Sequence, residues 1–160
     1  MATKVNPIPD GYSNVIPYLN VKDAAKAIEF YKKVFGAKEI GRLTSPDGKI
    51  GHSELQIGDS RIMLADENPE WGNKSPKSLG NTTVGLCIYA ENVDEIYKKA
   101  LDAGATADPN MGLQDQFYGD RSGTITDPFG HKWTIAKQIE KVSFEEMQKR
   151  YNAMFEKQKA

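Results

Sequence analysis

The chain has 160 residues, which fits one domain of ordinary size or two small modules that share a core. Hydrophobic residues make up 39% and charged residues 27%, as in a soluble globular protein, and a formal net charge of −1 offers no general attraction to nucleic acid or anionic lipid. With Cys87 as the one cysteine, no disulfide forms within the chain. No signal-peptide core and no membrane-spanning run is present, so we predict a cytoplasmic protein.

An irregular lead-in at residues 1–11 precedes a first predicted module at 12–66. Asp23 is a suitable N-cap and Gly36 a suitable C-terminal cap for one helix, because the apolar residues between them recur at helical spacing. Pro17 cannot donate to a ladder, so the strand that contains it is expected at a sheet edge. The strands are predicted at 12–21, 39–44, 49–57 and 61–66. The order is therefore β-α-β-β-β.

After a loop of prolines, glycines and charges at residues 67–81, the pattern returns in a second predicted module at 82–137. In both predicted helices a Tyr-Lys-Lys run is followed by Gly-Ala a few residues later. An internal repeat of this length predicts two like units that close on one another. We expect a strand at 82–89, a helix from Asn92 to Gly104, a short strand at 107–111, a loop at 112–119 and a final hairpin at 118–136 that turns at Asp-Pro-Phe-Gly.

Residues 138–160 are predicted to contain an amphipathic C-terminal helix. Ser143 and Glu146 have the spacing of a capping box, and apolar side chains then recur on one helical face. Such a helix packs on its own domain in the common case and covers a subunit partner in others. The sequence leaves both arrangements open.

The chain resembles the vicinal oxygen chelate superfamily over residues 12–137, through its tandem modules, a first helix that reads AAKAIEFYKKVFGA and a final hairpin that reads DPFGHKW. That superfamily includes glyoxalase I, extradiol dioxygenases, fosfomycin-modifying enzymes and bleomycin-resistance proteins. Similarity to its PhnB-like branch comes from GHSELQIGDSRIMLADE, YGDRSGTITDPFGHKW and VSFEEMQKR. The resemblance implies an α+β fold of two β-α-β-β-β modules that curl around a cleft, here with an added C-terminal helix, and assembly as a homodimer.

In the metal-dependent members of that superfamily, a His or Glu on each of four equivalent strands holds one divalent ion, and open positions chelate the substrate. The resemblance places these ligand positions at Ile16, at about Met63, at Val84 or Gly85, and at Thr134. None of these residues is a usual ligand for such an ion. We therefore predict that the usual metal site is absent and that the protein uses no cofactor.

His52 and Glu54 lie two residues apart on the strand predicted at 49–57, so both side chains project from one face. With Asp66 or Asp120 they could form a displaced metal cluster, and a His beside a carboxylate can also serve as a general base. The alternative is a half-solvated sheet face without a chemical role. A divalent metal is a cofactor only under the first interpretation.

Three further side chains have both a functional and a structural interpretation. Arg121 could anchor a carboxylate or phosphate, but we favour an ion pair of Arg121 or Asp120 with neighbouring strands that holds the hairpin in place. Trp71 could be a mobile lid or a pocket wall, or it could tether the long loop to the core. His131 follows the glycine of the turn and is predicted as a turn or surface residue.

We predict a metal-free protein that binds a small molecule in the cleft, either to sequester it, as bleomycin-resistance members do, or to act on it without a metal. One alternative is a divalent-metal-dependent lyase, isomerase or dioxygenase that uses the His52 and Glu54 cluster. Another is an interaction module whose cleft is filled by its own side chains. Whether a reaction is catalysed, and on which ligand, stays open.

The expected partners are a small molecule and a second copy of the chain, with no nucleic acid and no membrane. His52 and Glu54 are the candidates for a catalytic role. The expected ligand-binding residues are Ile16, Tyr18, His52, Glu54, Met63, Trp71, Tyr118, Arg121 and Trp133.

Overall fold

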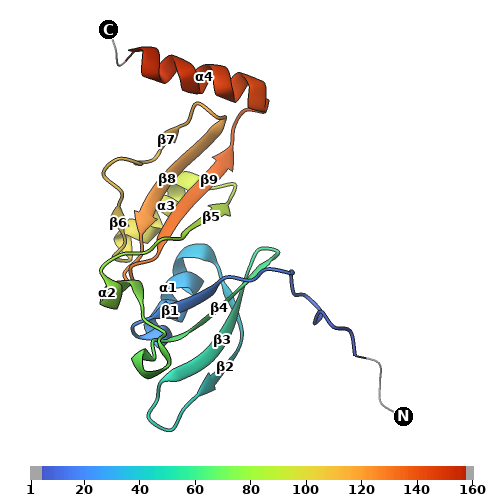
Figure 1. Ribbon diagram of the computed structural model, residues 1–160, viewed down its shortest axis with the longest axis vertical. Coiled ribbons are helices and arrows are strands. Elements are labelled where there is room, and N and C mark those ends of the chain that lie inside the picture. The colour runs from blue at the N-terminus through green and yellow to red at the C-terminus, as the bar shows by residue number, and fades with distance from the viewer. Residues whose placement is uncertain (1–4, 158–160) are drawn as a thin grey trace. The chain divides into compact units, whose positions relative to one another are not determined.

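A four-stranded sheet with a helix against one face forms the first of two units into which the chain divides, between Thr82 and Thr83 (Figure 1). The computed structural model describes residues 5–157. The strand order is β1-β4-β3-β2, with β1 parallel to β4 and the other pairs antiparallel. The elements are β1 (Tyr18–Val21), α1 (Ala24–Phe35), β2 (Lys38–Thr44), β3 (Ile50–Ile57) and β4 (Ser60–Asp66).

Alternation along β3 separates the two faces of this sheet. Ser53 and Leu55 are fully buried on the side of α1, whereas His52 and Glu54 project from the other side and stay half-buried. We call this other side the open face of the first sheet. The core lies between α1 and the strands, where burial of apolar surface stabilises the unit by about 25 cal/mol per Å². Its fully buried large side chains are Val21, Ile28, Tyr31, Leu55 and Leu64.

The predicted edge strand is confirmed but shorter than expected, since β1 has four residues. Pro17 lies just before it and still accepts a hydrogen bond from the backbone N–H of Met63 through its carbonyl oxygen. Helix α1 begins at its cap Asp23, whose side chain accepts from Lys26 N, and ends at Gly36 with φ 66°. Both predicted helix caps are therefore confirmed.

The segment at 67–81 was expected to be a loop without elements, and this expectation is wrong. It contains a 3₁₀ helix, η1 (Pro69–Trp71), and one turn of helix, α2 (Pro76–Leu79). A proline stands at the first turn of each, where the missing N–H costs nothing and the fixed φ favours helix. Ser75 caps α2 by accepting from Ser78 N. The prolines interpreted as loop residues thus begin short helices.

The second unit repeats the order of the first. Its sheet has the order β5-β9-β8-β6, with β7 paired to β8 and with β5 parallel to β9, as β1 is to β4. Strand β7 lies within residues 112–119, which were predicted as a loop, so that prediction is wrong at Gln114–Asp115. The elements are β5 (Gly85–Tyr89), α3 (Val93–Asp102), β6 (Thr106–Ala107), β7 (Gln114–Asp115), β8 (Asp120–Thr126), β9 (Lys132–Gln138) and α4 (Phe144–Lys157).

The predicted hairpin of β8 and β9 turns on Asp127. Its backbone oxygen accepts from Gly130 N at 3.0 Å, and Gly130 has φ 94°. The Asp127 side chain accepts from the N–H groups of Phe129 and His131, both at 2.9 Å. His131 is 8% exposed, so this turn residue is buried and not part of the surface.

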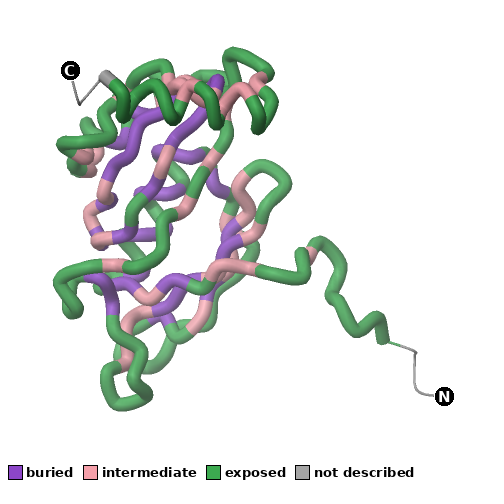
Figure 2. Tube along the Cα trace, turned by 45° about the horizontal axis from the view of Figure 1, so that its top comes forward, coloured by how far each residue is buried: buried purple, intermediate pink, exposed green. Residues whose placement is uncertain are grey.

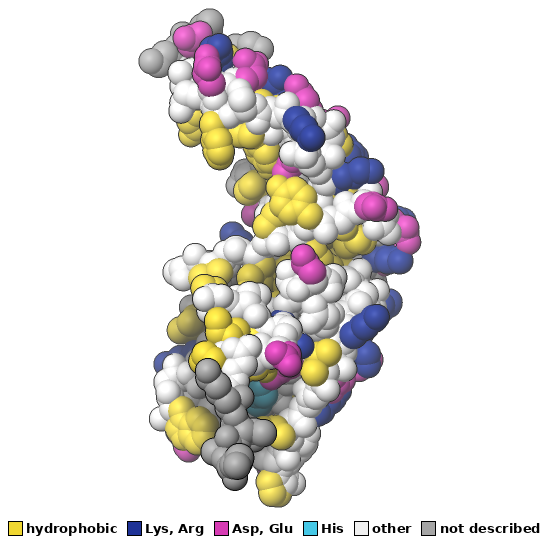
Figure 3. Space-filling view, turned by 90° about the vertical axis from the view of Figure 1, so that its right-hand side faces the viewer, with side chains coloured by type: hydrophobic (Ala, Val, Ile, Leu, Met, Phe, Trp, Pro, Cys, Tyr) yellow, Lys and Arg dark blue, Asp and Glu magenta, His cyan; other side chains and the backbone are white. Residues whose placement is uncertain are grey.

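Helix α4 begins with half of the predicted capping box, since the Ser143 hydroxyl accepts from Glu146 N at 3.2 Å. Arg150 connects the helix to the rest of its unit through Glu140 at 2.8 Å and the carbonyl oxygen of Phe117 at 3.1 Å. Hydrophobic side chains lie along the lower side of α4 in Figure 3, and charged ones cover its upper side. Several large hydrophobic side chains of α4 are between 46% and 89% exposed. They are Phe144, Tyr151, Met154 and Phe155.

The α+β fold of two β-α-β-β-β modules with a C-terminal helix is therefore confirmed. Figure 2 shows buried residues concentrated in the strands and in α1, and an exposed stretch near the N-terminus. Among residues 5–15, Tyr12 is half-buried and the others are exposed. Among the helices of residues 5–157, none combines the length and apolar character needed to cross a membrane.

Candidate ligand-binding site

The open face of the first sheet brings together side chains from three strands. Cross-strand pairing aligns Tyr18 of β1 with Met63 of β4, and Met63 with Glu54 of β3. His52 and Arg61 project from the same face, because each is two residues from a member of this row. The predicted common face of His52 and Glu54 is confirmed. We call Tyr12, Tyr18, His52, Glu54 and Arg61 the Glu54 cluster.

The Glu54 carboxylate is the centre of this cluster. It accepts a short hydrogen bond from the Tyr12 hydroxyl, a bond of 3.0 Å from Arg61 Nη1, and a longer contact of 3.4 Å with His52 Nε2. The Tyr12 hydroxyl is the main cause that holds the pKa of Glu54 below its ordinary value, against the opposing effect of burial. Glu54 is therefore an ionised acceptor engaged by three neighbours, which is a poor state for a general base.

Arg61 supplies the positive charge of the cluster. Its side chain is 14% exposed, and its guanidinium carbon lies 4.6 Å from the centre of the Tyr12 ring. This distance is within the range of a cation–π contact. Arg61 Nε is buried without a hydrogen-bond partner in the described part of the chain. Arg61 therefore holds Tyr12 and Glu54 together and keeps one unused donor.

Tyr18 and His52 form the other end of the cluster. The Tyr18 hydroxyl lies 3.0 Å from His52 Nδ1, and the two ring centres are 5.6 Å apart. Either partner donates, according to the tautomer of the imidazole. Burial raises the pKa of Tyr18, which keeps its hydroxyl protonated. The pair presents a polar edge next to an aromatic ring.

Beside Tyr18, the first unit has a hollow of about 860 Å³. Tyr18 and Asn20 of β1 and Ala65 of β4 contribute strand residues to it, and the turn before β3 and the loop after β4 supply the remaining walls. Trp71 borders the hollow and is 80% exposed. Glu67 fixes the loop by accepting from Ser75 N and from the Ser78 hydroxyl, both at 2.8 Å.

Other predicted ligand-binding residues lie in several places. Ile16 is half-buried and just precedes β1, and Met63 lies on the open face between Tyr18 and Glu54. Tyr118 belongs to the second unit, where its hydroxyl lies 3.0 Å from the Ser122 hydroxyl.

Arg121 and Trp133 do not lie on an open face, so that part of the prediction is wrong. Trp133 is 3% exposed in the core on the α3 side of the second sheet, and its indole N–H donates to Asp127 at 2.9 Å. Arg121 pairs with Asp94 of α3 at 2.6 Å and with Asp115 at 3.0 Å. Arg121 therefore has the structural role that we favoured, with one partner on the neighbouring strand β7 and the other on α3.

The alternation of side chains along a strand could have excluded Trp133 from the expected ligand-binding residues. Thr134 contacts Thr124 through their hydroxyls at 2.9 Å, on the face opposite α3, and adjacent strand residues point to opposite faces. The same rule could have added Arg61, because it stands two residues before Met63. Tyr12 lies outside every strand, so its contact with Glu54 had no local signal.

The residues at the positions that the resemblance gives for the metal ligands do not fit a divalent ion. The corresponding positions carry Ile16, Met63, Thr134 and either Val84 or Gly85, which offer no imidazole or carboxylate. Within residues 5–157, no three His, Cys, Asp or Glu side chains are close enough to hold a metal ion.

The displaced cluster lacks a third ligand, because no further carboxylate of the described residues lies close enough to complete it with His52 and Glu54. Asp66, one of the two candidates, uses its carboxylate oxygens to accept from Ala24 N and Ile50 N, both at 2.8 Å. Glu54 is occupied by Arg61. His52 and Glu54 therefore have hydrogen-bonding roles in this fold.

Three comparisons place the chain among known proteins. The family model described as Glyoxalase/Bleomycin resistance protein/Dioxygenase superfamily matches residues 13–135. An uncharacterized protein of Mycobacterium bovis is 44% identical over 135 residues, which cover 82% of this chain and 88% of that protein. A bleomycin resistance protein of Geobacillus stearothermophilus is 29% identical over 133 residues, which cover 78% and 96%.

Solved structures agree on the fold. A gene product of Arabidopsis thaliana aligns with a TM-score of 0.62 at 27% identity, covering 78% of this chain and 98% of the other. The PhnB protein from Bacillus cereus aligns with a TM-score of 0.59 at 15% identity, covering 78% and 99%. The second match is evidence for fold alone, and it agrees with the resemblance to PhnB-like proteins.

Proposed function

Since the chain belongs to the glyoxalase/bleomycin resistance protein/dioxygenase superfamily, we propose that it is a cytoplasmic small-molecule-binding protein. The ligand lies in the hollow on the open face of the first sheet and is held without a metal ion at the four family positions. The observation that carries this proposal is the hollow of about 860 Å³ beside Tyr18, with Asn20 in its wall and Trp71 at its border. Ligand pockets commonly have volumes of roughly 300–1,000 Å³. Polar side chains such as Ser45, Asp47 and Asn68 also line this hollow, which favours a ligand with several polar groups.

The side chains around the hollow suggest how a ligand is held. The rings of Tyr18 and Trp71 offer apolar area, and Trp71 is the last residue of η1 at the border of the hollow. Asn20 and the Tyr18 hydroxyl orient polar groups of the ligand. Because Tyr18 also contacts His52, a ligand that hydrogen-bonds to Tyr18 is coupled to the Glu54 cluster.

The relative from Geobacillus stearothermophilus supports sequestration as the biological role, because it is named as a bleomycin resistance protein. The chain would then lower the free concentration of an organic compound without changing it. Nothing in the Glu54 cluster requires a reaction, since the Glu54 carboxylate accepts from Tyr12 and Arg61 and contacts His52. Binding is the function that this geometry supports best.

Calorimetric titration tests the proposal with metal-free bleomycin and a panel of aromatic and amphipathic compounds. We expect at least one compound to bind wild-type protein, and Tyr18→Ala and Trp71→Ala to weaken it about tenfold or more, the loss of one anchor side chain. Leu79→Ala is the matched control, because Leu79 is 63% exposed on nearby α2 and does not border the hollow. Equal affinity in all variants, or no binding across the panel, would overturn the proposal.

Elemental analysis tests the metal-dependent alternative separately. Purified tag-free protein is incubated with Zn, Ni, Co, Mn and Fe(II) and then desalted. About one retained ion per chain, lost when His52 and Glu54 are both replaced by Ala, would contradict the metal-free proposal and assign these residues as ligands. Metal content that is negligible and identical in both proteins supports it.

We also propose that the chain forms a homodimer. The support is the apolar side of α4, where Phe144 is 89% exposed and Phe155 is 48% exposed (Figure 3). A large exposed apolar patch is typical of a surface that binds another protein. Sedimentation velocity at several concentrations tests this, and Phe144→Ser with Phe155→Ser is expected to shift the protein to monomer. A monomer at every concentration of wild-type protein would contradict it.

A further inference from the structure

The second sheet has a polar face on the side away from α3, on which Ser122 and Ala136 are buried and Tyr89 is exposed. Tyr89 of β5 pairs with Ala136 of β9, and Ala136 with Ser122 of β8, so these three form one row. Asp120 pairs with Gln138 in the next row of the same face. The Tyr89 hydroxyl donates to Asp120 Oδ2 at 2.6 Å.

Asp120 is a buried acid without a cationic partner. It is 6% exposed, and Tyr89 is its one side-chain hydrogen-bond partner among the described residues. The second carboxylate oxygen of Asp120 has no such bond and is accessible to solvent. An ionised carboxylate with this little solvent and no counter-charge is costly in free energy.

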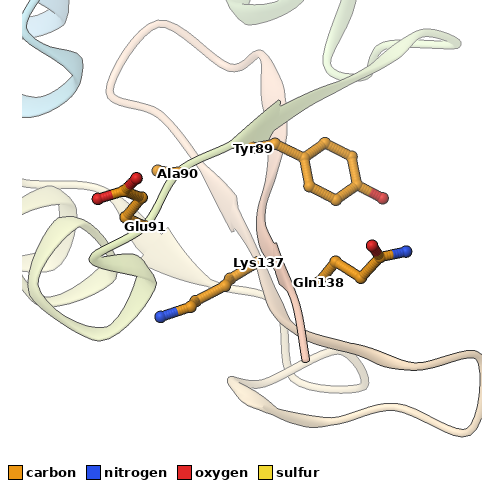
Figure 4. Close-up of a pocket in the computed structure, with 5 residues that line it drawn as sticks. All are labelled: Tyr89, Ala90, Glu91, Lys137 and Gln138. Carbon is orange, nitrogen blue, oxygen red and sulfur yellow. The ribbon is translucent and has the colours of Figure 1, made fainter. Parts of the chain in front are cut away.

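The basic residues next to Asp120 and Gln138 in the sequence, Arg121 and Lys137, belong to the opposite face of the sheet. Arg121 is held by Asp94 on the α3 side. Figure 4 shows Lys137 extending to the side of the strands opposite Tyr89 and Gln138. In residues 5–157, no Lys, Arg or His forms an ion pair with Asp120, so this part of the protein leaves its charge uncompensated.

Two tyrosine side chains lie near this carboxylate. Tyr89 is 64% exposed, and Tyr118 lies two residues before Asp120 with its hydroxyl on Ser122. Tyr118 is close enough to Tyr89 to help raise the pKa of Tyr89 to about 12, mainly because the Tyr89 hydroxyl donates to Asp120. Ala136, between Tyr89 and Ser122 in the row, is 1% exposed, so the exposed part of this face is on the Tyr89 side.

We propose that this face of the second unit is a binding site for organic ammonium ions, with Asp120 as counter-charge and the rings of Tyr89 and Tyr118 as walls. A protonated amine supplies the N–H donors that the second oxygen of Asp120 lacks. Its positive charge also interacts favourably with the electron-rich faces of tyrosine rings. Gln138 offers an amide oxygen as a further acceptor on the same face (Figure 4). This site is separate from the hollow of the first unit and does not depend on the function proposed there.

The test is a titration of the full chain, labelled with ¹⁵N, with benzylammonium chloride at fixed ionic strength, followed by amide chemical shifts. Benzyl alcohol serves as the neutral probe of the same shape. We expect millimolar binding of the ammonium alone, with shifts at Tyr89, Tyr118 and Asp120. Asp120→Asn should weaken binding about tenfold or more, since it removes the charge and keeps the shape.

Glu91→Gln is the matched control. Glu91 is an exposed acid close in sequence to Tyr89, and Figure 4 shows it on the opposite side of the strands. It should leave the affinity unchanged, because a general attraction of cations to acidic surface would respond equally to both substitutions. Tyr89→Phe keeps the ring and frees Asp120 Oδ2, so it should tighten binding, and it gives an independent result if Asp120→Asn does not fold.

Three outcomes would overturn the proposal. One is equal binding of benzylammonium and benzyl alcohol, and another is equal weakening by Glu91→Gln and Asp120→Asn. The third is no binding to wild-type protein together with a dimer that Asp120→Asn dissociates in sedimentation, since a basic residue of a second copy would then be the partner of Asp120.

Discussion

The indole N–H of Trp133 donates to one carboxylate oxygen of Asp127 at 2.9 Å, and both residues are buried. The other oxygen accepts from the backbone N–H groups of Phe129 and His131, both at 2.9 Å. One acid therefore closes the turn between β8 and β9 and ties it to a large aromatic side chain in the core of the second unit. Hydrogen bonds to a buried charge are the stronger kind, and each donor left unpaired costs free energy.

Replacement of Asp127 by Ala should lower the free energy of unfolding by about 3 kcal/mol or more, because three buried N–H donors lose their acceptor. Asp127→Asn should cost less, since its amide oxygen can still serve the two backbone donors. Urea unfolding followed by tryptophan fluorescence measures both. Asp59→Ala, in an exposed turn, is the control, and a loss for Asp127→Ala no larger than for Asp59→Ala would contradict the role assigned to this carboxylate.

Gly123 is required by close packing in the second unit. A Cβ atom there would lie 2.7 Å from Tyr97 Cε2 and 2.8 Å from the backbone of Leu113. Gly123→Ala should therefore cost about 2 kcal/mol of stability, as overpacking does. Gly85→Ala in the same sheet is the control, since a Cβ atom at Gly85 would meet no other atom within 4 Å, and it should change stability by about 0.5 kcal/mol or less. Thermal unfolding compares them, and equal effects would mean that the packing at Gly123 is loose.

Glu67 gives the first unit a specific acid sensitivity. Backbone and side-chain hydrogen bonds from Ser75, with one from Ser78, lower its pKa from an ordinary 4.5 to about 2. A lowered folded-state pKa means that the contribution of Glu67 to stability is present above about pH 4.5 and disappears as the pH falls through about 2.

The difference in unfolding free energy between wild type and Glu67→Gln should therefore be constant near neutral pH and shrink between about pH 4.5 and 2. Urea unfolding across this range measures it. Ser78→Ala removes one donor and should give a smaller version of the same trend. A difference that stays the same at about pH 7 and at about pH 2.5 is incompatible with this account.

Tyr12 should control the ionisation of Glu54. Its hydroxyl is the largest cause of the lowered pKa of Glu54, ahead of His52 and Arg61. Tyr12→Phe keeps the ring against Arg61 and should raise the pKa of Glu54 towards its ordinary value. A ¹³C titration of the Glu54 carboxyl carbon by NMR checks this. Tyr18→Phe, which contacts His52 and not Glu54, is the control, and an unchanged pKa in Tyr12→Phe would assign the shift to Arg61 instead.

The sequence predicts the secondary-structure elements of this protein better than the contacts between them. The two β-α-β-β-β modules, the helix between Asp23 and Gly36, and the common face of His52 and Glu54 all follow from local rules of capping and alternation. The short helices at 67–81 were missed because proline ends one element and begins another, and the sequence alone does not distinguish the two.

The contacts that define the sites required the tertiary structure. Tyr12 reaches Glu54 across 42 residues, Tyr89 reaches Asp120 across 31, and Arg121 reaches Asp94 across 27. Such pairs depend on which strands become neighbours and in which register, and a periodic pattern describes only the faces of one element at a time. The sequence by itself determined the order of the two modules and the common face of His52 and Glu54. The fold decided which charged side chains find partners there, and it leaves Asp120 without a cation in the described part of the chain.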